Sequence, residues 1–203
     1  MTTTSTGNEA GMRPIGVLAL QGGYEAHART LTRLGHATRW VRTPGDLEGL
    51  GGLVLPGGES STMLKLLAFA GLEAPLDAAV RNGLPVLATC AGLILSATRV
   101  TGPEQRAFGW LDVDVARNAW GRQVHSFESL ADVDPAEPDR VPFSLVFIRA
   151  PRMLRVGPGV EVVARLGGEP VAVRQGSVTG ASFHPELTDD DRLHARVFGA
   201  PGR

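Results

Sequence analysis

The chain has 203 residues, a formal net charge of −1 and 43% hydrophobic residues. A chain of this length and composition can bury a sizeable core, so we expect one compact domain. The balanced charge and the scattered basic residues argue against nucleic acid and against a membrane surface as partners.

The N-terminal residues and the cysteine count suggest where the protein works. Residues 1–13 lack the basic start and apolar middle of a secretion signal, so we expect a disordered tail before a single domain at 14–203. Cys90 is the only cysteine, which excludes an internal disulfide and favours a reducing, cytoplasmic location. No Cys/His cluster has metal-site spacing, and we expect neither a metal nor a cofactor.

Short apolar runs alternate with helical patterns in the first half of the chain. The runs at 15–20, 37–42, 53–55 and 85–89 predict strands. Helical spacing predicts helices after residue 23, through 60–69, over 74–81 and after Cys90. Apolar strands that alternate with helices are typical of a parallel sheet covered on both faces.

The second half is richer in β-structure. Segments 110–116, 143–148, 160–166, 170–175 and 178–183 are short and separated by Gly and Pro turns, and we expect them to extend the sheet as antiparallel strands. A closing helix is predicted within 189–199. The predicted fold is therefore an α/β three-layer sandwich with a mixed, mostly parallel central sheet flanked by helices.

Three loops follow predicted parallel strands, at 21–23, 56–60 and 89–92. Ligands of such sheets bind at the carboxyl ends of the strands. Cys90 lies in the third loop, between a strand and a helix, where several enzyme folds present a nucleophile. Backbone N–H groups at a helix start stabilise a thiolate. The alternative interpretation is an inert, buried cysteine in the core.

A cysteine nucleophile needs a base and a group that orients the base. His184 ends an apolar strand, and Pro185 favours an extended backbone there, so the side chain of Glu186 lies on the same side as His184. Cys90, His184 and Glu186 thus form a candidate triad. The alternative is a strand-end histidine with a solvated Glu186. We interpret the remaining histidines as surface or structural residues: His27, His36, His125 and His194.

Acyl transfer also needs donors for the developing oxyanion. The N–H of Ala91, directly after the cysteine, is one candidate. The N–H of Gly58 is a second, because a glycine lets the backbone approach a ligand closely. The alternative interpretation of Pro56-Gly57-Gly58 is an ordinary turn.

Six motifs stand in chain order within 15–188: "GVLALQG", "LPGGESSTM", "TCAGLI", "RNAWGRQVHSFE", "FIRAP" and "GASFHPELT". Together they resemble the class I glutamine amidotransferase family. Within that family they are most similar to members that supply ammonia for pyridoxal 5′-phosphate (vitamin B6) synthesis.

The resemblance implies hydrolysis of L-glutamine to glutamate and ammonia. By motif position Cys90 is the nucleophile, His184 and Glu186 complete the triad, and Gly58 and Ala91 form the oxyanion hole. A free amino acid offers a carboxylate to a guanidinium and an ammonium to an acid. The implied substrate contacts are Gly58, Glu59, Ser60, Arg117, Ile148 and Arg149.

The resemblance also implies a partner, a (β/α)₈-barrel pyridoxal 5′-phosphate synthase subunit in a large hetero-oligomer. Two positions depart from the family pattern. His125 stands where an Asp is usual, and Glu25-Ala26 stands where the family has Arg-Glu. Both lie outside the triad, so we expect them to affect docking or activation more than the chemistry.

Three alternatives stay open at the level of the sequence. In the first, the chain is a glutaminase subunit of another amidotransferase. In the second, it is a catalytically silent scaffold subunit. In the third, it is a different cysteine hydrolase with the same strand-to-helix corner at its cysteine. Partner exchange, substitution of Cys90 and a substrate panel would separate them.

Overall fold

The computed structural model describes residues 13–119, 126–132 and 141–199. Except for Arg13, the predicted tail 1–13 lies outside the described residues, as does His125. None of the helices in the described ranges is long and apolar enough to cross a membrane.

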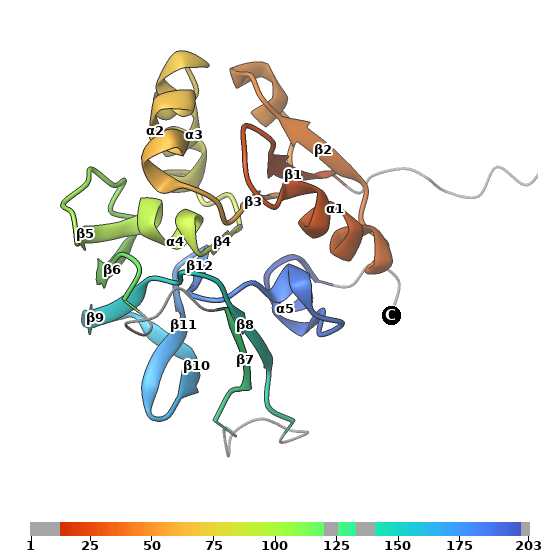
Figure 1. The fold of residues 1–203 in the computed structure, drawn as a ribbon. Helices are drawn as coiled ribbons and strands as arrows, with labels where there is room; N and C mark the ends of the chain where they lie inside the picture. Colours follow the sequence, from red (N-terminus) through yellow and green to blue (C-terminus); the bar gives the residue numbers. More distant parts are fainter. Residues whose placement is uncertain (1–12, 120–125, 133–140, 200–203) are drawn as a thin grey trace, which may run out of the picture.

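A seven-stranded sheet forms the centre of the molecule, with the strand order β10-β11-β12-β4-β3-β1-β2 (Figure 1). Its parallel strands are β1 (Ile15–Leu18), β2 (Thr38–Val41), β3 (Gly52–Leu55), β4 (Val86–Thr89) and β12 (Val178–Ala181). Antiparallel pairing joins β10 (Glu161–Leu166) to β11 (Glu169–Gln175) and β11 to β12. The predicted mixed, mostly parallel sheet is confirmed.

The helices cover both faces of this sheet. They are α1 (Tyr24–Arg33), α2 (Ser60–Phe69), α3 (Glu73–Arg81), α4 (Ala91–Ser96) and α5 (Arg192–Phe198), with 3₁₀ turns η1 (Pro44–Leu47) and η2 (Pro185–Leu187). In Figure 1, α2 and α3 lie together on one side of the sheet, and α1 and α5 lie on the other.

Two core clusters fill the space between the sheet and these layers. Because successive side chains of a strand point to opposite faces, Leu53 and Leu55 of β3 pack under α2 and α3, whereas Val54 packs toward α1 and α5. All three are fully buried. This explains why β3 is apolar throughout rather than alternating.

The predicted extension of the sheet is wrong in two respects. Segment 178–183 contains β12, which runs parallel to β4 rather than antiparallel. Segments 110–116 and 143–148 contain β6 (Leu111–Ala116) and β8 (Ser144–Phe147), which belong to separate small sheets. In the central sheet β4 lies between β3 and β12, so neither β6 nor β8 pairs with it.

The small sheets also contain strands that were not predicted. β6 pairs with β5 (Ala97–Thr101) and β9 (Arg152–Val156), and β8 pairs with β7 (Phe127–Leu130). β5 begins directly after the last residue of α4. No Gly or Pro turn therefore separates the helix from the strand in the sequence.

Candidate functional site

Cys90 occupies a sharp corner between β4 and α4. Its backbone has φ 48° and ψ −99°, a conformation that costs of order 1–3 kcal/mol outside glycine. The Cys90 N–H donates to Ala181 O (2.8 Å) and its carbonyl accepts from the Ile94 N–H (3.1 Å). These bonds to the neighbouring strand and the following helix hold the corner, and the residue is only 6% exposed.

His184 follows β12 and lies beside the same corner. Its N–H donates to Val146 O (2.8 Å), and its Nδ1 lies 2.7 Å from Glu186 Oε1. Burial by itself lowers the pKa of His184, but hydrogen bonds with Cys90 and Glu186 outweigh it and raise the pKa to about 10. Burial likewise raises the pKa of Glu186, but His27 and His184 outweigh it and keep that pKa low.

Gly57 fits between the cysteine and the histidine. A Cβ added at Gly57 would lie 2.3 Å from His184 Cε1 and 3.3 Å from Cys90 Cβ. Both side chains therefore lie close to Gly57, and both line the same cavity, which places the thiol and the imidazole on the same side of the sheet. Cys90 Sγ also lies 4.0 Å from Ile148 O.

A cavity of about 290 Å³ opens beside these residues. This is close to the lower limit for small-molecule pockets, roughly 300 Å³. The cavity wall includes Cys90, His184 and Glu186 and every predicted substrate contact: Gly58, Glu59, Ser60, Arg117, Ile148 and Arg149. Ala91, the other predicted oxyanion donor, is the first residue of α4, and its side chain is fully buried.

Glu59 has a structural role in addition to its place in the cavity wall. Its carboxylate accepts hydrogen bonds from the N–H groups of Ser61 (3.1 Å) and Thr62 (2.7 Å) and thereby caps α2. The Thr62 hydroxyl and these N–H groups lower the pKa of Glu59 to about 2. Arg117 Nη2 lies 3.0 Å from Glu59 Oε1. One predicted acidic contact and one predicted basic contact therefore pair with each other in the free protein.

The first loop supports the second. Gln21 Oε1 accepts from the Glu59 N–H and Gln21 Nε2 donates to Glu59 O, both at 3.2 Å. The Gly23 N–H donates to Gly57 O (3.1 Å). These contacts join the loops after β1 and β3, and Gly57 lies close to Cys90 in the loop after β4.

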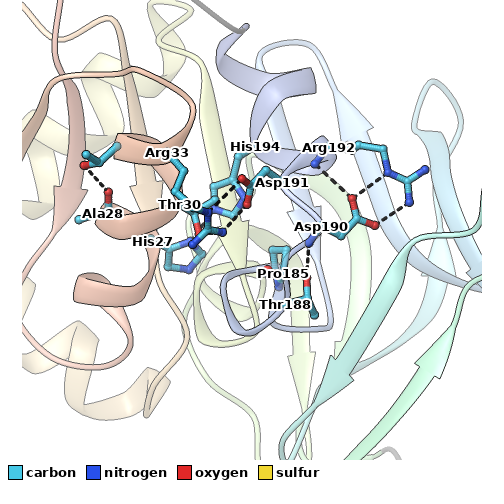
Figure 2. A network of polar contacts seen from close by, with 11 residues as sticks. His27, Ala28, Thr30, Arg33, Pro185, Thr188, Asp190, Asp191, Arg192 and His194 are labelled. Carbon is cyan, nitrogen blue, oxygen red and sulfur yellow. Dashed lines mark hydrogen bonds and ion pairs between the residues drawn. The ribbon is translucent and has the colours of Figure 1, made fainter.

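Two histidines that we interpreted as surface or structural residues lie next to the triad. His27 on α1 and His194 on α5 are both completely buried, and His27 Nε2 is 3.3 Å from Glu186 Oε2. Figure 2 shows His27 and His194 close together where the two helices meet. The available signal was the position of His27 in the apolar stripe of α1, four residues before the buried Leu31.

Of the two departures from the family pattern, one lies in the described residues. Glu25 is exposed in the first turn of α1, and Ala26 is buried. His125 lies beyond the described ranges.

Comparison with known proteins gives a consistent result. The model of the SNO glutamine amidotransferase family matches residues 17–199. A relative from Corynebacterium jeikeium (strain K411), "Pyridoxal 5′-phosphate synthase subunit PdxT", is 52% identical over 186 residues, which cover 89% of this chain and 92% of the relative. A subunit with the same name from Thermotoga maritima is 46% identical over 180 residues, covering 89% and 95%.

The fold is found among solved structures as well. A structure described as "Crystal structure of glutamine amidotransferase" superimposes with a TM-score of 0.83 at 48% sequence identity. The match covers 91% of this chain and 98% of that one.

Proposed function

This chain belongs to the SNO glutamine amidotransferase family, and from that membership we propose that it is the glutaminase subunit of a pyridoxal 5′-phosphate synthase. It hydrolyses L-glutamine and passes the ammonia to a synthase subunit. One observation carries the proposal: Cys90 and His184 lie against the same glycine, His184 bonds Glu186, and all three line one cavity.

The first half of the reaction transfers the glutamyl group to sulfur. The Cys90 thiolate attacks the side-chain amide carbon of glutamine, and a C–S bond forms as the carbonyl oxygen becomes an oxyanion. The N–H groups of Gly58 and Ala91 stabilise that oxyanion. Protonated His184 gives its proton to the departing nitrogen, the C–N bond breaks, and ammonia leaves.

The second half releases glutamate. Neutral His184 removes a proton from water, and the resulting hydroxide attacks the thioester carbon. The C–S bond breaks, the Cys90 thiolate returns, and the imidazolium is restored. Glu186 holds the Nδ1–H of His184 throughout and stabilises its charged form.

The cavity wall offers a group for each end of a free amino acid. The Glu59 carboxylate attracts the substrate ammonium, and the Arg117 or Arg149 guanidinium suits the carboxylate. Ser60 and the Ile148 backbone complete the contacts. In this proposal the substrate ammonium and carboxylate bind the two partners of the Glu59–Arg117 ion pair.

The partner in this proposal is a (β/α)₈-barrel synthase subunit, which forms a hetero-oligomer with this chain. Ammonia released into water near neutral pH becomes ammonium and loses its nucleophilicity, so direct transfer to a bound acceptor is required. The curated relatives are themselves named as synthase subunits. A reducing, cytoplasmic setting is part of the proposal, because the Cys90 thiol must stay unoxidised to react.

The test mixes the full chain with a barrel synthase subunit and follows glutamate release. We expect the mixture to hydrolyse glutamine and Cys90→Ala to abolish hydrolysis while still assembling. If the assembled Cys90→Ala variant still hydrolysed glutamine, the proposed triad would be wrong and the chain would be a catalytically silent scaffold subunit. If only the synthase of a different pathway activates the chain, the assignment to pyridoxal 5′-phosphate is wrong.

A further inference from the structure

The carboxylate of Glu186 has a second buried neighbour besides His184. Its Oε1 lies 2.7 Å from His184 Nδ1, and its Oε2 lies 3.3 Å from His27 Nε2. Within the described part of the chain, Oε2 has no hydrogen bond of good geometry. His27 Nε2 is shared between this oxygen and the hydroxyl of Thr89, 3.1 Å away at the end of β4.

The other nitrogen of His27 faces a third imidazole. His27 Nδ1 is 2.9 Å from Nε2 of His194, and both rings are completely buried. Burial lowers the pKa of His27, more strongly than the charge of Glu186 raises it. Burial, with help from His27 and Arg33, also lowers the pKa of His194, to about 3. Both rings are therefore neutral near neutral pH.

Neutrality determines where the protons lie. A neutral imidazole has one donor nitrogen and one acceptor nitrogen. A lone pair on His27 Nε2 would face the Glu186 carboxylate and be repelled, so that nitrogen carries the proton. His27 Nδ1 is then an acceptor, and the Nε2–H of His194 donates to it. The remaining nitrogen, His194 Nδ1, needs no acceptor, in agreement with its lack of a hydrogen-bond partner among the described residues.

The helices that carry these rings are also joined at the surface. Arg33 of α1 donates to Thr30 and forms an ion pair with Asp191, the residue before α5 (Figure 2). In the described residues, the charged or titratable groups around Glu186 and the two rings are His184 and Cys90 on the cavity side and this Arg33–Asp191 pair on the outer side.

We propose that His27 is a positioning residue of the site: its Nε2–H faces Glu186 Oε2 and so holds the other carboxylate oxygen on His184 Nδ1. His194 selects the His27 tautomer that makes this possible. A carboxylate that is hydrogen-bonded to His184 at one oxygen and attracted by the His27 N–H at the other resists rotation about its terminal bond, and the imidazole that it orients keeps its Nε2 toward Cys90. The inference rests on the proposed function only in assigning a reaction to that imidazole.

The test uses the lone thiol of the full chain and needs no substrate. Iodoacetamide alkylation of Cys90, measured across pH, reports how well the imidazolium supports the thiolate. His27→Leu removes the donor, which raises the pKa of Glu186 and weakens its support of His184. His27→Gln keeps an N–H donor at a comparable position. Leu31→Ala, a buried substitution on the same helix, is the control for destabilisation alone.

We expect His27→Leu to slow alkylation near neutral pH by at least about tenfold, because a less well supported imidazolium stabilises less of the reactive thiolate. We expect His27→Gln and Leu31→Ala to remain near the wild-type profile. An unchanged profile in His27→Leu, or equal losses in His27→Leu and Leu31→Ala, would overturn the proposal.

A second measurement tests the protonation pattern directly. In ¹⁵N-histidine-labelled protein near neutral pH, we expect the NMR signals of His27 to show a neutral Nε2–H tautomer, and those of His194 likewise. A His27 that is cationic or protonated on Nδ1 would contradict the inference. Hydrolysis by the assembled Cys90→Ala variant would refute only the proposed reaction, since neither measurement above depends on glutamine.

Discussion

At Gly57 the backbone runs so close to the His184 imidazole that an added side chain would collide with it. An alanine Cβ would approach His184 Cε1 to 2.3 Å, and His184 is buried and bonded to Glu186. We expect Gly57→Ala to lower kcat for glutamine about 100-fold, since a displacement of about 1 Å is enough for such a loss.

The matched control for this substitution is Gly45→Ala, because a Cβ at Gly45 meets nothing within 4 Å. Steady-state glutaminase assays of the assembled complex compare the two variants. Similar kinetics for both would show that the close approach at Gly57 has no catalytic consequence.

The raised pKa of His184 predicts how stability depends on pH. The value rises from 6.5 in the unfolded chain to about 10 in the folded one. A raised pKa means that the folded state binds the proton more tightly. The contribution of protonated His184 to the free energy of unfolding is therefore complete below pH 6.5 and is lost between pH 6.5 and about 10. Urea unfolding of wild type and His184→Asn across this pH range measures that contribution. The difference between the two proteins should shrink toward pH 10, and a growing difference would contradict the assigned sign.

At the scale of elements, α2 depends on a residue that also lines the cavity. Because Glu59 caps two N–H groups, Glu59→Ala should lower the free energy of unfolding by about 1 kcal/mol. Asparagine is a good cap, so Glu59→Asn should recover most of this stability while still weakening glutamine binding.

Chemical denaturation and the KM for glutamine separate the two roles of Glu59. Glu48→Ala serves as the control, because Glu48 is exposed and its hydrogen bonds to Arg39 and Gly45, within the described residues, use only its backbone. If Glu59→Asn restored both stability and KM, the carboxylate would have no role in substrate binding.

On the scale of the whole molecule, the two core clusters share one sheet. Leu53 packs in the cluster under α2 and α3, and Leu31 packs in the cluster on the opposite face. We propose that residues 14–203 fold as one domain, so removing either side chain should destabilise the whole structure. Leu53→Ala and Leu31→Ala should each lower the free energy of unfolding by about 2–5 kcal/mol.

Fluorescence and far-UV circular dichroism should report one coincident unfolding transition in wild type and in both variants. Separate transitions, or a variant that shifts one probe alone, would show that the two faces unfold independently.

Much of the architecture was readable from local patterns. Apolar runs of strand length, helical spacing and Gly/Pro breaks identified β1 to β4 and the loops after them, because these features depend on neighbours in the sequence. The candidate triad followed from a thiol at a strand-to-helix corner and a histidine at a strand end. That these two ends meet at one edge depends on the parallel pairing of β12 with β4, whereas the sequence predicts an antiparallel strand there. Glu186 beside His184 needed only the alternation of an extended chain.

The tertiary structure decided what depends on distant parts of the chain. The pairing of β4 with β12 joins segments that lie far apart in the sequence, whereas β6 and β8 pair with strands of the small sheets. His27 and His194 are 167 residues apart, and no local pattern distinguishes a buried histidine that faces a carboxylate from a structural one. The sequence by itself determined the strands, the loops and the reactive side chains; long-range packing determined which buried groups surround them, because burial and hydrogen bonding arise only when the layers assemble.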